Sequence, residues 1–225
     1  MTTGSWLCVT VAVALALVDW TSIVYGRRLV DLIVKPLVPA SLMVAALLAH
    51  PVQHGVQLPL VLALAFGTAG DLAPVAREPI SHTVLWQQTR NRFFIAGLTS
   101  FLLVHVLYAV AMLAHDVDWP SAVFGLALVF LSIGACGQRI VRGAYRQGGR
   151  PLAVAVTCYV VAMGASVTLG VGTNSLLIAY GSVLFAGSDL VLAYDRFVKA
   201  RSWSRITVIV SYHLAQVALL IGLVR

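Results

Sequence analysis

Apolar segments of about the same length recur along the whole chain, and this repetition constrains the fold more than any other feature. A helix that spans the hydrocarbon core of a bilayer needs about 20 predominantly apolar residues. Eight segments approach that length, at residues 5–25, 30–49, 56–74, 93–114, 119–140, 151–171, 174–195 and 204–224. The first segment is too long for a cleaved signal peptide and has no basic region before it. The sequence therefore predicts an all-α polytopic membrane protein, with residues 1–225 forming one domain of eight transmembrane helices.

The composition excludes several other classes of protein. Of the 225 residues, 60% are hydrophobic and only 10% are charged, whereas a soluble domain carries about 25% charged residues. The three cysteines, at positions 8, 136 and 158, lie far apart and show no C-x-x-C spacing. We therefore expect neither a soluble enzyme nor a disulfide, zinc or redox site. The net charge of +7 lacks a basic cluster interleaved with aromatic residues, so we expect no nucleic-acid partner.

The distribution of basic residues predicts the orientation of the chain. Thirteen of the fifteen Lys and Arg residues lie in connections that follow the odd-numbered segments. Lys35 lies inside a segment, and only Arg225 falls on the opposite side. Basic residues are retained in the cytoplasm, so we expect both termini outside an inner or plasma membrane. The basic connections, of which the longest is a short loop at about 75–92, would also attract anionic membrane lipids.

Ionisable residues inside the predicted spans form the second informative pattern. Each costs at least about 2.5–3.5 kcal/mol at the centre of a bilayer, so each is a functional candidate. Counting the helical rise from the cytoplasmic end places five of them about 5–12 Å deep. These five come from five different spans, and they are Asp19, Lys35, Asp71, Asp189 and His213. His105 and Gln216 lie deeper, and Tyr212 is a polar neighbour. This shared depth predicts a cavity that opens toward the cytoplasmic leaflet.

Structural roles explain some of the same residues. Lys35 can extend its ammonium group to the interface, Asp19 can serve as its ion-pair partner, and His213 can be a hydrogen-bonded core residue. Other patterns lack a functional interpretation. His50 and His54 are separated by Pro51, and residues 115–118 form a polar turn. The chain has no H-E-x-x-H, G-x-S-x-G or P-loop motif. Paired carboxylates remain as the available chemistry.

Several short motifs resemble those of the YhhN family, to which animal transmembrane lysoplasmalogenases are related. The resemblance extends over nearly the whole chain. It is carried by Lys35-Pro36, by Gly70-Asp71-Leu72, by a G-L-x-S-F-x-x-x-H-x-x-Y pattern from Gly97 to Tyr108, by Ser188-Asp189, and by Tyr212 with Gln216. It implies hydrolysis of the vinyl ether bond of a lysoplasmalogen, which releases a fatty aldehyde and glycerophosphocholine or glycerophosphoethanolamine. The substrate would be a lysophospholipid from the cytoplasmic leaflet.

This chemistry assigns expected roles to the polar residues inside the predicted spans. Vinyl ether hydrolysis needs a group that protonates carbon, an anion and a base, and two carboxylates in a partly dry site can divide these tasks. We expect Asp71 and Asp189 to be this pair, without metal or cofactor. The candidates for substrate binding or orientation are Asp19, Lys35, His105, Tyr108, Tyr212, His213 and Gln216. The same residues are compatible with a proton-coupled transporter or with a lipid-binding protein that has no catalytic activity.

Overall fold

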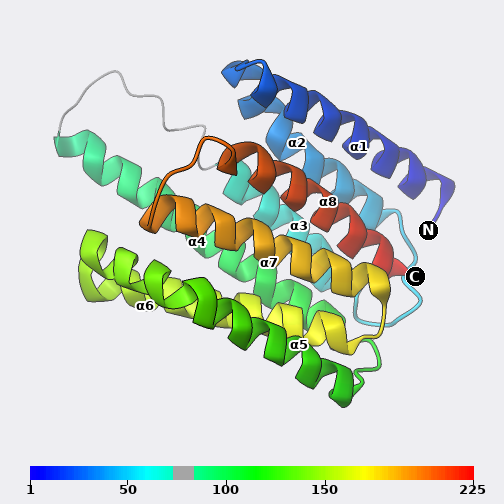
Figure 1. The fold of residues 1–225 in the computed structure, drawn as a ribbon. Helices are drawn as coiled ribbons and strands as arrows, with labels where there is room; N and C mark the ends of the chain where they lie inside the picture. Colours follow the sequence, from blue (N-terminus) through cyan, green and yellow to red (C-terminus); the bar gives the residue numbers. More distant parts are fainter. Residues whose placement is uncertain (73–83) are drawn as a thin grey trace.

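A computed structural model describes residues 1–72 and 84–225 of the chain, and the described residues form a helical bundle without strands (Figure 1). The elements are α1 (Thr3–Val24), α2 (Arg28–Leu47), α3 (Gln57–Leu72), α4 (Val84–Met112), α5 (Trp119–Ser132), the π-helical turn η2 (Ile133–Gly137), α6 (Gln138–Gly172), α7 (Leu176–Phe197) and α8 (Ser204–Val224). The all-α prediction is confirmed.

Membrane-spanning length is reached by six helical segments among the described residues. The run from Trp119 to Gly172, which includes α5, η2 and α6, is one of these six, although the chain bends within it at Gly148 and Gly149. Helix α3 is shorter, with 16 residues. These segments support a multi-pass membrane protein. The number of eight spans stays a prediction.

Two boundaries differ from the predicted spans. Helix α4 begins at Val84, so the prediction of a loop through residue 92 is wrong. No Gly or Pro interrupts residues 84–96, so the helix can extend past its apolar part. The predicted connection 75–92 also includes residues 73–83, which lie outside the described residues.

The second difference concerns the predicted connection between residues 140 and 151, which is mostly helical. The chain bends only at Gly148 and Gly149, and Gly149 has a φ of 66° that favours glycine. Beyond this bend the chain returns along α5, since Gly125 of α5 faces the backbone of Thr168. The basic residues before the bend are good helix formers, so the helix continues beyond the apolar segment.

Six helices surround a common centre. Helix α2 packs on α3, α3 on α4, α4 on α6, α6 on α7, and α7 on α8, which in turn contacts α2. Helix α1 packs on α2 and α8, and α5 packs on α6. Side chains of six helices can therefore face one shared space.

The two ends of the bundle differ in charge. Both termini lie at the same end (Figure 1). At the opposite end α1, α3 and α7 finish and α2, α4 and α8 begin. We call this the basic end because it carries Arg27, Arg28, Arg139, Arg142, Arg146, Arg150, Arg196, Lys199, Arg201 and Arg205. The charge asymmetry of the sequence thus corresponds to one end of the fold.

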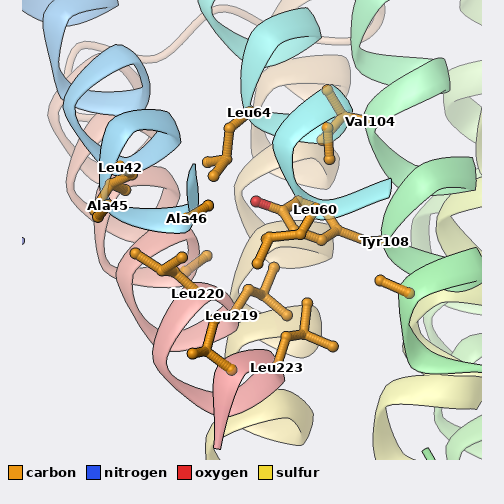
Figure 2. Close-up of a cluster of buried hydrophobic side chains, with 14 of the residues drawn as sticks. Leu42, Ala45, Ala46, Leu60, Leu64, Val104, Tyr108, Leu219, Leu220 and Leu223 are labelled. Atoms are coloured by element: carbon orange, nitrogen blue, oxygen red, sulfur yellow. The ribbon is translucent and has the colours of Figure 1, made fainter. Parts of the chain in front are cut away.

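The main hydrophobic core occupies the half of the bundle nearer the termini. Leu42, Leu60, Leu219 and Leu223 are fully buried there, with Ala45 and Ala46 among them (Figure 2). Small residues let the helices approach closely. Apolar side chains fill this half of the bundle. The space that the six helices share therefore lies toward the basic end.

The polar turn predicted at residues 115–118 lies between α4 and α5. The Asp118 carboxylate accepts a hydrogen bond from the backbone N–H of Ser121 at 2.9 Å, as an N-cap residue does. Hydrogen bonds from Ser121 lower the pKa of the Asp118 carboxyl below its ordinary value. The turn residue therefore has a local structural role at the start of α5.

Close packing at the basic end depends on Gly143. A Cβ atom at this position would lie 2.1 Å from the backbone oxygen of Phe197. We expect Gly143→Ala to lower the midpoint of thermal unfolding by more than about 2 °C, because overpacking costs about 1–3 kcal/mol. Gly187→Ala is the matched control, since a Cβ there meets no atom within 4 Å. Equal midpoints for the two variants in a thermal-shift assay would contradict this contact.

Candidate active site

A cavity of about 770 Å³ lies inside the ring of six helices, toward the basic end. Its opening carries charged side chains that include Arg28, Asp31 and Arg205. Most of the wall is apolar, with residues such as Leu98, Val160 and Met163. Its inner polar groups come from five helices and are Lys35, Asp71, Tyr159, Asp189 and Tyr212. The cavity thus combines a charged opening, an apolar wall and two buried carboxylates.

The first carboxylate, Asp71, is held by a cation and a hydroxyl group. Asp71 lies near the end of α3, and its side chain is fully buried. The Nζ atom of Lys35 in α2 lies 2.8 Å from Oδ1. The hydroxyl group of Tyr212 in α8 donates to Oδ2 at 3.0 Å. Both oxygens of Asp71 are therefore engaged, and the Lys35 ammonium group compensates the charge of this carboxylate.

The second carboxylate, Asp189 in α7, has a different arrangement. His105 Nε2 lies 2.8 Å from Oδ2, and the Tyr159 hydroxyl group donates to the same oxygen at 2.6 Å. No described residue makes a hydrogen bond to Oδ1. The side chain lines the cavity and remains 9% exposed. Asp189 therefore keeps one oxygen available to a molecule in the cavity.

Aromatic rings connect the residues that bind the two carboxylate groups. The ring centroid of Phe185 lies 4.5 Å from that of His105 and 5.5 Å from that of Tyr212. The ring of Phe101 packs edge-on against Tyr212 at 5.7 Å. A Cβ at position 70 would lie 2.8 Å from the Phe101 ring, so glycine lets this ring lie beside Asp71. The rings connect the partners of both carboxylates in one packed cluster.

The motifs that resemble the YhhN family contain residues that line this cavity, among them Lys35, Asp71 and Asp189. The family model of YhhN matches residues 30–223. The chain belongs to the YhhN family. No curated protein and no solved structure matches it. The matched region of this YhhN protein includes every cavity-lining residue except Arg28.

The remaining residues predicted for the YhhN site lie behind the cavity lining. The Tyr108 hydroxyl group donates to Oε1 of Gln216, and both side chains are fully buried. His105 does not line the cavity but contacts Asp189, which does. His213 Nδ1 accepts a hydrogen bond from the indole N–H of Trp20 at 3.1 Å. Tyr108, Gln216 and His213 are not among the cavity-lining residues.

Asp19 does not have the partner suggested by the sequence. Its side chain is fully buried in α1, and neither carboxylate oxygen has a hydrogen-bond partner among the described residues. The predicted ion pair between Asp19 and Lys35 is wrong, because Lys35 pairs with Asp71. Helix α2 packs between α1 and α3, and the Lys35 side chain extends toward α3.

Sequence reasoning missed two features of this site. Tyr159 lies in an apolar stretch of α6 and bonds to Asp189. Tyr159 could have been identified because its hydroxyl group lies far from either end of the predicted span 151–171. The ion pair between Asp31 and Arg205 was also missed. Both residues lie in the first turn of their helices, where charged residues are usually attributed to topology alone.

Proposed function

We propose that this YhhN-family protein hydrolyses the vinyl ether bond of a lysoplasmalogen. The products are a fatty aldehyde and glycerophosphocholine or glycerophosphoethanolamine. One observation carries the proposal: Asp71 and Asp189 line a single cavity, and each is held by its own pair of side chains. The apolar wall suits a lipid chain, and the reaction needs neither a metal nor a cofactor.

Hydrolysis begins with transfer of a proton to the outer alkene carbon, which leaves an oxocarbenium ion. Water adds to the carbon that bears the ether oxygen and loses a proton to a base. The resulting hemiacetal collapses to the aldehyde and the free glycerol hydroxyl group. The protein must therefore supply an acid, an anion near the cation and a base.

Asp189 is the proposed acid because its Oδ1 atom is available to the cavity. The two groups bound to Oδ2, His105 and Tyr159, stabilise the carboxylate that remains after the proton has left. Asp71 is the proposed anion and base. Its partners Lys35 and Tyr212 hold it in position, and general acid–base catalysis of this kind contributes about 10²–10⁴-fold.

The position of the cavity favours an enzyme over a transporter. A transporter site lies near the midplane of the bilayer, whereas this cavity opens toward the basic end of the bundle. A position in one leaflet suits an enzyme that takes its substrate from that leaflet. A lipid-binding protein without catalytic activity is distinguished by replacing both aspartates with asparagine, which would leave its binding intact.

The direct test is hydrolysis by the purified protein in lipid vesicles. We expect it to release aldehyde from 1-alkenyl-glycerophosphoethanolamine or 1-alkenyl-glycerophosphocholine. The matched control substrate has a saturated ether in place of the vinyl ether and should stay intact, because it cannot form the oxocarbenium ion by protonation of carbon. Absence of aldehyde from the vinyl ether substrate with folded protein would contradict the proposal.

Topology gives a separate prediction. Basic residues gather at one end of the bundle and both termini lie at the other (Figure 1), so the termini should face outward and the cavity the cytoplasm. A reporter that is active only outside the inner membrane should be active when fused after Arg225 or before Thr3. An active cytoplasmic reporter at either terminus would contradict this orientation.

A further inference from the structure

Two ion pairs lie one above the other along the same helices. Asp31 and Lys35 are four residues apart in α2, which places them on one face about 6 Å apart along the helix axis. Arg205 and Tyr212 are seven residues apart in α8, or about 10 Å. Asp31 pairs with Arg205, and Lys35 and Tyr212 both bind Asp71. The outer pair therefore lies one or two helical turns nearer the basic end than the inner group.

The outer ion pair borders the cavity and is accessible. Asp31 and Arg205 both line the opening, and an Arg205 Nη2 atom lies 2.5 Å from Asp31 Oδ2. The Arg205 side chain is 51% exposed, while that of Asp31 is 7% exposed. A guanidinium group has five N–H donors, so Arg205 can bind a second anionic partner beside Asp31.

The formal charges of the described lining residues are balanced. Four are basic, namely Arg28, Lys35, Arg196 and Arg205, and four are acidic, namely Asp31, Asp71, Asp189 and Asp195. A lining that presents both signs at its opening, as Asp31 and Arg205 do, fits a ligand that carries both charges. A phosphodiester joined to an ammonium group has this property.

We propose that Asp31 and Arg205 form the binding site for a zwitterionic phosphodiester–ammonium headgroup. This inference rests on the proposed function, because the glycerol backbone of a lysoplasmalogen would connect this headgroup to the vinyl ether. The phosphate binds the guanidinium fork of Arg205, which matches its oxygens in a bidentate contact. The ammonium group binds the carboxylate of Asp31. The separation of the outer and inner groups then places the vinyl ether beside Asp71 and Asp189.

Three substrates that differ only in the headgroup test the site. They are 1-alkenyl-glycerophosphoethanolamine, 1-alkenyl-glycerophosphate and 1-alkenylglycerol. We expect Arg205→Gln to raise KM about tenfold for the two phosphate-bearing substrates, because a hydrogen bond to a charged group is lost. The KM for 1-alkenylglycerol and all three kcat values should stay unchanged. An equal rise in KM for all three substrates would overturn the proposal.

Asp31→Asn separates the ammonium contact from the phosphate contact. We expect a KM increase of about tenfold for the ethanolamine substrate only, with an unchanged or lower KM for 1-alkenyl-glycerophosphate. Arg201→Gln is the matched control, because Arg201 lies at the same end but stacks on Tyr194 and Trp203 instead of lining the cavity. If Asp31→Asn raised KM equally for both phosphate-bearing substrates, the ammonium assignment would be wrong.

Loss of folding and failure of the proposed function are distinguished by further measurements. Arg205→Lys keeps the positive charge but loses the guanidinium fork. It replaces Arg205→Gln if that variant does not fold. We expect it to give a smaller KM increase for the same two phosphate-bearing substrates. If the wild-type protein cleaves no substrate, the proposed function fails, and binding of the saturated-ether analogues tests the headgroup site. Weaker binding of only the phosphate-bearing analogues to Arg205→Gln would support the site. Equal binding to wild type and variant would overturn it.

Discussion

Replacement of Asp189 by asparagine is expected to lower aldehyde release from a lysoplasmalogen by at least about 100-fold. Asparagine keeps the size of the side chain and accepts hydrogen bonds from His105 and Tyr159, but it cannot donate a carboxylic proton. The rate is measured with purified protein in vesicles, and folding is checked by thermal unfolding. Asp116→Asn is the matched control, because Asp116 is exposed at the other end of the bundle. Near-normal turnover by Asp189→Asn would contradict its role as the acid.

Asp71→Asn is expected to have an effect of similar size, at least about 100-fold. This variant removes the proposed base and leaves the Lys35 ammonium group without its carboxylate partner at 2.8 Å. Because the two aspartates act on one reaction, the double variant should be scarcely slower than the slower single variant. Losses that multiply in the double variant would instead show that the residues act independently. Asp19→Asn should have a smaller effect, because Asp19 does not line the cavity.

The sequence was sufficient to predict the all-α fold and the similar depth of two polar residues that are in contact. Lengths of apolar segments identified where the chain forms helices, and the rise per residue placed Lys35 and Asp71 at a similar depth. The structure joins these two side chains directly. Depth along a helix follows from counting residues, so it can be estimated without knowing which helices are neighbours.

Partners across helices could not be predicted in the same way. Lys35 pairs with Asp71 instead of Asp19, and the choice depends on the rotation of α2 between its two neighbours. The contact of Tyr159 with Asp189 depends on α6 packing beside α7. A single sequence contains no information on such neighbours, and a tyrosine in an apolar stretch gives little signal. The start of α4 was missed because an apolar pattern indicates only the part of a helix that lies in the membrane. The helix itself can begin before that part.

In the proposed mechanism, Asp189 transfers a proton to the outer alkene carbon of the vinyl ether. Hydrolysis in D₂O tests it most directly, because the solvent hydrogen that is added becomes bound to the carbon next to the aldehyde group. Mass spectrometry of the aldehyde, converted at once to a stable derivative, should show one deuterium at that carbon with the wild-type protein and almost no product with Asp189→Asn. Aldehyde without deuterium at that position, or no aldehyde from folded wild-type protein, would contradict the account.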